Sequence, residues 1–193
     1  MPLEKQFNTD EALGAAMSAF WARGYEATSI QDLVDCMGIN RGSLYATFGD
    51  KRSLFIQALR RYDAVHRKAW IAALVEAKSP RAAIAGAFEG AISAVLDAGL
   101  RDGCLLVNTA LELSPHDREI SEIVSRGLSE MEGFFREMIE TGQEAGEIPP
   151  TVAPVDTARS LLGLFIGLRV LARSRPDEAL LRSVANQAEA LLG

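Results

Sequence analysis

The chain has 193 residues, of which 48% are hydrophobic and 24% charged, a balance typical of a globular protein with a sizeable core. No apolar run reaches the roughly 20 residues of a membrane-spanning helix, and the first residues lack the basic start and apolar centre of a signal peptide. The net charge of −6 argues against indiscriminate nucleic-acid binding, and two cysteines without an export signal indicate reduced thiols. We therefore expect a cytoplasmic protein with no membrane partner.

The first predicted helix runs from Thr9 to Arg23. Thr9 is its expected N-cap, and the apolar residues that follow at helical spacing include Phe20. Gly24 ends the helix. We expect Phe20 to be a core residue and this helix to support the segment that follows.

Two short helices joined by a tight turn are predicted between residues 24 and 51. Ser29 is a suitable N-cap for a helix over about residues 30–36, and Asn40 for a second helix over about 41–47. Asp50 caps a third helix that begins at Lys51. A helix, a short turn and a second helix in this order form a helix-turn-helix.

The second of these helices carries small, hydroxylated or basic side chains and no acidic one, in the order Arg41, Gly42, Ser43, Tyr45, Ala46 and Thr47. Small residues let a helix approach base edges closely, whereas arginine and hydroxyl groups bond bases or phosphates. A helical hairpin that only packs, with Tyr45 half-buried, is the alternative.

The residues of this region resemble the DNA-binding signature of TetR-family transcriptional regulators: Phe20, Gly24, Tyr25, Thr28, Ser29, Ile30, Leu33, Gly38, Ile39, Gly42, Ser43, Leu44, Tyr45, Phe48 and Lys51 to Leu54. The resemblance implies an all-α fold of about nine helices. It implies a helix-turn-helix head over residues 1–51 and a larger ligand-binding and dimerisation body over residues 52–193.

The expected DNA contacts lie on the second helix and at its flanks. Tyr45 and Lys51 should position the head through phosphates, because a hydroxyl and a helix N-terminus both suit an anion. Base reading is expected from Arg41, Ser43 and Thr47, close backbone approach from Gly42, and a phosphate contact from Thr28. Residues 1–51 hold four Lys/Arg and seven Asp/Glu, so specific binding should depend on a few contacts.

Apolar periodicity predicts further helices over residues 51–76, 80–99, 104–114, 116–145, 154–174 and 176–192. No His, Cys, Asp and Glu set has metal-ligand spacing, and no phosphate loop or nucleophile motif is present. We therefore predict no metal, no cofactor and no enzymatic activity.

The helix over residues 158–172 is apolar around most of its circumference, with Gly163 and Gly167 one turn apart. Such a helix lies either in a core or against a partner. The family resemblance implies a homodimer formed by the last two helices.

Cys104 follows Gly103 at the start of a predicted helix, where the helix dipole would lower the pKa of a thiol and promote the reactive thiolate. The segment resembles that of a subgroup including NemR-like repressors, in which the cysteine of a Gly-Cys-Leu motif senses electrophiles or oxidants. A small buried hydrophobe is the alternative role. Cys36, in the helix-turn-helix scaffold, is expected to be structural.

A pocket for a small-molecule effector is expected among the body helices. Asn108 and Glu112 lie one turn apart amid apolar residues, and a buried carboxylate needs either a partner in the protein or a polar ligand. The other candidate lining residues are Phe88, Phe134 and Phe165, with His66 and Trp70 at the end nearest the head.

The sequence therefore predicts a repressor that is released from a near-palindromic, double-stranded DNA operator by a small molecule or an electrophile. Two alternatives remain. One is a helical ligand- or partner-binding protein without operator binding, and the other is a small helical enzyme.

Overall fold

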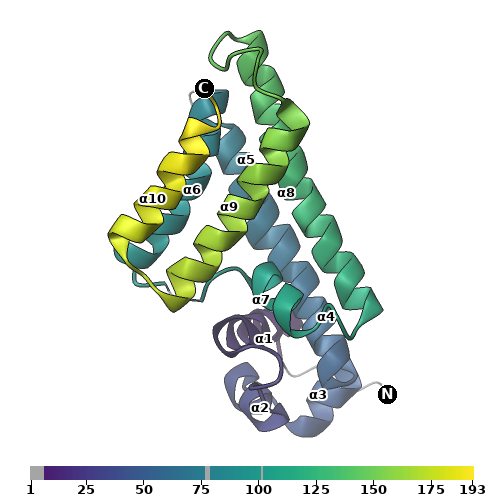
Figure 1. Cartoon of the computed structure of the whole chain (residues 1–193). Helices are drawn as coiled ribbons and strands as arrows, with labels where there is room; N and C mark the ends of the chain where they lie inside the picture. The colour runs from purple at the N-terminus through teal and green to yellow at the C-terminus, as the bar shows by residue number, and fades with distance from the viewer. Residues whose placement is uncertain (1–6, 77–78, 101) are drawn as a thin grey trace.

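The computed structural model describes residues 7–76, 79–100 and 102–193, and these residues form nine continuous helices and no strand (Figure 1). The head contains α1 (Thr9–Arg23), α2 (Ile30–Met37) and α3 (Arg41–Phe48). One unbroken helix follows, composed of α4 (Lys51–Tyr62), the π-helical turn η1 (Asp63–Arg67) and α5 (Lys68–Val75). The body adds α6 (Pro80–Leu96), α7 (Leu105–Glu112), α8 (Arg118–Glu144), α9 (Pro154–Ser174) and α10 (Glu178–Ala190). The all-α prediction is confirmed.

A search of the described helices found none with the length and apolar character needed to cross a membrane.

The helices of the head begin where their capping residues stand. The Ser29 hydroxyl accepts from Asp32 N at 3.1 Å, and the Asp32 carboxylate accepts from Ser29 N at 2.8 Å, which forms a capping box. Asn40 caps α3 as predicted. The expected cap of α1 is wrong: Asn8, one residue before Thr9, is extended and accepts from the first-turn N–H groups.

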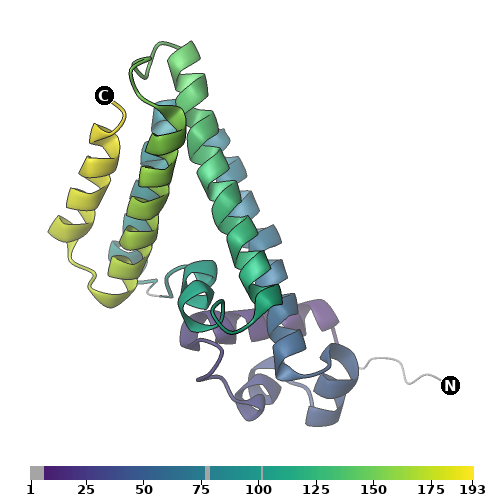
Figure 2. The ribbon, with the colours of Figure 1, turned by 45° about the vertical axis from the view of Figure 1, so that its right-hand side comes forward.

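The core of the head continues into the lower body. Phe20, Leu33 and Phe55 are almost completely buried, and the same hydrophobic cluster includes Leu106 of α7 and Ile120 of α8. Figures 1 and 2 show α7 at the junction between head and body, and α8 running from that junction to the far end. A change in α7 or in the first turn of α8 therefore acts directly on the packing of the head.

The linking helix contains a π-helical turn that the sequence pattern did not indicate. The N–H of Lys68 donates to the carbonyl of Asp63, an i to i+5 bond in place of the usual i to i+4. In a regular α-helix, Arg67 would lie about 140° around the axis from Tyr62, whereas a π-turn brings these two positions towards one face. Arg67 is consequently buried, at 6% exposure.

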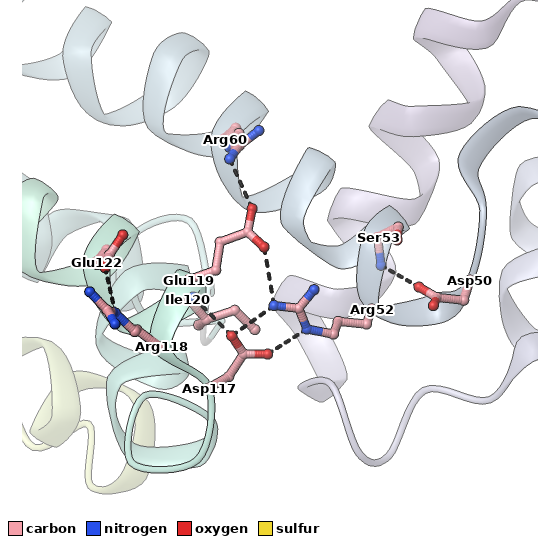
Figure 3. A network of polar contacts seen from close by, with 9 residues as sticks. All are labelled: Asp50, Arg52, Ser53, Arg60, Asp117, Arg118, Glu119, Ile120 and Glu122. Carbon is pink, nitrogen blue, oxygen red and sulfur yellow. Dashed lines mark hydrogen bonds and ion pairs between the residues drawn. The ribbon is translucent and has the colours of Figure 1, made fainter.

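An ion-pair network joins the start of α4 to the start of α8 (Figure 3). Arg52 Nε lies 2.5 Å from Asp117 Oδ2, and both Arg52 and Arg60 bond Glu119. The Arg52 guanidinium, by its hydrogen bonds, lowers the pKa of the Asp117 carboxyl to about 2. This network holds the start of α8 against the linking helix.

The lowered Asp117 pKa predicts a loss of stability in acid. Because the pKa is lower in the folded state than the unfolded value of about 3.9, the stabilisation is present above that value and disappears as the pH falls through about 2. Asp117→Asn keeps an oxygen that accepts from the Ile120 N–H. Because it removes the titrating carboxyl, the free energy of unfolding should depend less on pH in this acidic range. Unfolding measured between about pH 5 and about pH 2 tests it. Asp156→Asn, on the exposed face of α9, is the control; identical slopes for wild type and Asp117→Asn would contradict the expectation.

Candidate functional site

One face of α3 is exposed at the end of the head, away from α9 and α10 (Figure 1). Leu44 and Phe48 anchor the helix in the core, which turns Arg41 and Tyr45, one turn apart, to the outside. The Tyr45 side chain is 46% exposed, although it is a large aromatic residue. Among the described residues, Arg41 makes no ion pair. No carboxylate of the described residues therefore neutralises the Arg41 guanidinium.

The other predicted contact residues differ in their exposure to solvent. Gly42 is exposed, whereas Ser43 and Thr47 are partly buried. Lys51 lies in the first turn of α4, with its Nζ 4.3 Å from the centre of the Tyr25 ring. Exposed or partly exposed side chains therefore follow α3 from Arg41 to Thr47, and Lys51 lies at the start of the next helix.

Thr28, the other predicted phosphate contact, has a buried hydroxyl in this structure. Thr28 is 0% exposed, and its hydroxyl donates to the carbonyl of Gly24 at 2.6 Å. The residue therefore shapes the turn before α2. Its side chain offers no group to a phosphate.

A cavity of about 220 Å³ lies between the linking helix, α7, α8 and α9, with Trp21 of α1 contributing from the head. Of the residues predicted to line a pocket, four do so: His66, Trp70, Cys104 and Phe165. Aliphatic side chains such as Leu106, Met131 and Leu162 form much of the remaining wall. The cavity is smaller than the roughly 300–1,000 Å³ of drug-sized sites, so it suits a compact ligand.

The remaining four predicted pocket residues, Phe88, Asn108, Glu112 and Phe134, do not line this cavity. Phe88 and Phe134 are core residues of the body, with 2% and 4% exposure. The amide of Asn108 donates to the Asp102 carbonyl at 2.9 Å. Local polar pairing and tight packing therefore remove these side chains from the site.

Glu112 connects the body to the head. Its carboxylate accepts from the backbone N–H of Tyr25 at 3.0 Å and from that of Glu26 at 2.7 Å. Of the two partners that the sequence left open for this carboxylate, the structure shows the one within the protein. Since α7 begins at the cavity with Cys104 and ends at Glu112, one short helix touches both the cavity and the head.

Cys104 stands at the N-cap position of α7, and its sulfur makes no cap bond. Its Sγ accepts from the Tyr62 hydroxyl at 3.5 Å. Burial, followed by the adjacent Cys104, raises the pKa of Tyr62 well above its usual value, so the phenol stays protonated. Cys36, in contrast, is exposed on α2 and lies outside the cavity.

The sequence reasoning missed four polar or aromatic residues of the cavity wall: Trp21, Tyr62, Arg67 and Arg169. The spacing of Tyr62, His66 and Trp70, each four residues apart, could have indicated one shared face. Helical spacing could not have indicated Arg67, because only the π-turn brings this residue to the cavity wall. Arg169 and Trp21 both donate to the carbonyl of Gly103, a contact between distant segments.

A search of the described residues found no group of three or more His, Cys, Asp or Glu side chains that could hold a metal ion.

The outer face of α9 carries two glycines one turn apart, Gly163 and Gly167. Buried Leu161, Phe165 and Leu168 face the core of the body. On the remaining surface, a Cβ added to Gly163 or Gly167 would meet no atom within 4 Å. Another helix could therefore approach this face closely.

Comparisons with known proteins agree over both parts of the chain. The family model described as "Bacterial regulatory proteins, tetR family" matches residues 12–58, and "Tetracyclin repressor-like, C-terminal domain" matches residues 80–188. The repressor ComR of Escherichia coli is 33% identical over 170 residues, covering 88% of this chain and 81% of its own. The uncharacterized regulator YezE of Bacillus subtilis is 34% identical over 148 residues, 77% of this chain and 76% of its own.

Solved structures share the fold. A cysteine mutant of the TetR-family regulator CifR, complexed with a 26-bp operator DNA, is 29% identical and has a TM-score of 0.85, covering 98% of this chain and 99% of its own. Reduced NemR of E. coli has the same TM-score of 0.85 at 18% identity, with coverage of 95% and 96%, which is a likeness of fold.

Proposed function

Because the chain belongs to the TetR family of DNA-binding transcriptional regulators, which are not enzymes, we propose that it is a dimeric cytoplasmic repressor. It binds a near-palindromic operator through a head comprising residues 1–51. A body comprising residues 52–193 dimerises and holds a small-molecule or electrophilic effector. The observation that carries the proposal is the exposed, acid-free face of α3 at the end of the head.

The proposed operator contacts follow from the exposure of each side chain. Arg41 reads a base edge, with Ser43 and Thr47 beside it, because arginine has a planar fork of donors suited to guanine. Tyr45 and Lys51 bond phosphates and fix the register of the head. Gly42 lets the backbone of α3 approach the groove.

Dimerisation through α9 and α10 is supported by the open space at Gly163 and Gly167. Val170 on α9 is 39% exposed in the single chain, and Leu191, which directly follows α10, is 38% exposed. A two-fold dimer places two heads on half-sites roughly 34–36 Å apart or a geometric variant of this spacing.

Release by an effector is supported by the position of the cavity. Two of its walls, the linking helix and α7, are tied to the head through the helix itself and through Glu112. A ligand that fits one arrangement of these walls better than another shifts the population of head positions by its differential affinity. The dimer then no longer matches the operator spacing.

Alkylation of Cys104 is expected to weaken operator binding about tenfold, within the usual range of allosteric coupling. N-ethylmaleimide adds its alkene carbon to the sulfur, and the thiol proton goes to the neighbouring carbon. The added group then occupies the cavity wall beside Tyr62. Operator titration before and after treatment is the measurement.

The two cysteines provide the control for this experiment. Cys36→Ser should still respond to N-ethylmaleimide, because Cys36 is exposed on the head and outside the cavity. Cys104→Ser should not respond. If the response disappears in Cys36→Ser but remains in Cys104→Ser, the reactive thiol is Cys36 in the head, and the proposed role of Cys104 is wrong.

The function is tested by recovering genomic fragments that bind the purified protein, with Tyr45→Ala as the control. Enrichment of a near-palindromic site, lost in the variant and weakened by salt, is expected. If no fragment is enriched over Tyr45→Ala, the operator proposal is wrong, and the helical binding-protein alternative takes its place.

A further inference from the structure

Arg67 is a buried cation whose Nη1 amino group has no partner among the described residues. Its side chain is 5% exposed, and it belongs to the wall of the cavity. The Nε group donates to Asp63 and the Nη2 group to Glu130, whereas Nη1 is buried and has no hydrogen-bond partner in the described chain. A buried donor left unpaired costs about 1–3 kcal/mol, so this N–H favours a ligand that brings an acceptor.

The π-turn of the backbone places Arg67 at this wall, because it brings the residue towards the face of Tyr62. On α8, Gly127 lies beside both Arg67 and Leu106. An added Cβ would make an ordinary contact with Arg67 Nε at 3.6 Å, but it would come within 2.7 Å of a methyl carbon of Leu106. Irregular turns of this kind are frequent at functional sites.

The charges around Arg67 favour a neutral acceptor at this point of the wall. Arg67 and Arg169 carry the two positive charges of the wall, and Asp63 and Glu130 bring two negative charges to Arg67. Because Arg67 is already paired with two carboxylates, a third anion beside it would be repelled. A neutral carbonyl oxygen accepts the free N–H without adding charge.

Resting on the proposed role of the cavity as the effector site, we propose that it takes a compact, apolar, neutral carbonyl compound whose oxygen accepts from Arg67 Nη1. The apolar part of the ligand packs against aliphatic and aromatic walls such as Met131, Leu162 and Phe165. This acceptor fixes the orientation of the ligand, as a few polar groups do in most small-molecule sites.

Three molecules of equal size and shape test the proposal: cyclohexyl methyl ketone, isopropylcyclohexane and cyclohexanecarboxylate. They present a carbonyl, no acceptor and an anion on the same ring. Binding is measured by calorimetry and by the fluorescence of Trp21 and Trp70, which are the two tryptophans of the chain and both line the cavity. We expect the ketone to bind about tenfold or more tightly than either of the others, since a hydrogen bond to a charged donor is strong.

Arg67→Lys retains the charge for Asp63 and Glu130 but removes the planar third donor. The tenfold preference for the ketone over the hydrocarbon should vanish in this variant, whereas Arg169→Lys should retain it. Thermal unfolding checks that each variant is folded; should Arg67→Lys not fold, the comparison of the three probes on the wild type still decides.

Equal binding of ketone and hydrocarbon, tighter binding of the carboxylate, no binding of any probe, or a ketone preference that survives Arg67→Lys overturns the proposal. These readouts use no DNA. Failure of the ligand assignment is therefore distinguishable from failure of operator binding, which the genomic-fragment experiment measures.

Discussion

Replacing Arg41 and Tyr45 together by alanine is expected to lower operator affinity by about a hundredfold or more and to leave the head folded. The two side chains lie one turn apart on the exposed face of α3, where neither supports the core. A good base contact contributes about 1–3 kcal/mol, and losing a base and a phosphate contact together compounds the effect. Exposed substitutions of this kind usually change stability by less than about 0.5 kcal/mol.

The measurement is an operator titration at several salt concentrations, together with thermal unfolding. Removing the Arg41 cation from the interface should reduce the dependence of log affinity on log salt by up to about one unit, whereas the uncharged Tyr45 hydroxyl should not change it. Arg136→Ala, on α8 of the body, removes the same charge and is the control. A similar loss of affinity in both variants would show that net charge, rather than the surface of α3, governs binding.

Gly163→Arg is expected to convert the dimer to a monomer and to reduce operator affinity by about 10²–10⁴-fold. Gly163 and Gly167 have open space around them in the single chain, so arginine fits the isolated body but not a helix packed against its copy. Losing the second head removes the effective-concentration advantage of a two-headed protein, which is of this size. Sedimentation gives the oligomeric state, and operator titration gives the affinity.

Gly133 supplies a matched control for this prediction. It also lies inside a long helix, and an added Cβ there would likewise meet nothing within 4 Å. Gly133→Arg should therefore remain dimeric and bind the operator with wild-type affinity. If Gly163→Arg stays dimeric, the partner does not use this face of α9.

The starts of the helices in the head could be predicted from the sequence, because a capping side chain bonds the backbone of residues close to it in the chain. Ser29, Asn40 and Asp50 each bond a backbone N–H three residues ahead, so the start of each helix depends on adjacent residues. At α1, the predicted N-cap lies one residue after the N-cap in the structure. Asn8 and Thr9 are both suitable caps, and local propensity does not separate them.

The cavity could be predicted only in part, because its walls come from segments far apart in the chain. Helical spacing supports His66 and Trp70 on one face, but the π-turn that adds Arg67 leaves no pattern in the sequence. Glu112 had two possible partners, and the backbone of residues 25 and 26 became visible as its partner only in three dimensions. The burial of Thr28 likewise depends on the turn after α1, which becomes visible only in three dimensions.

The junction at Glu112 has a consequence for how such a regulator diverges. The carboxylate contacts main-chain N–H groups of residues 25 and 26, which every amino acid except proline provides. The contact itself therefore does not depend on which side chains stand at these two positions. A chimera of two such regulators has to keep the backbone shape of this turn, and it must also match the apolar side chains of the core that the head shares with α7 and α8.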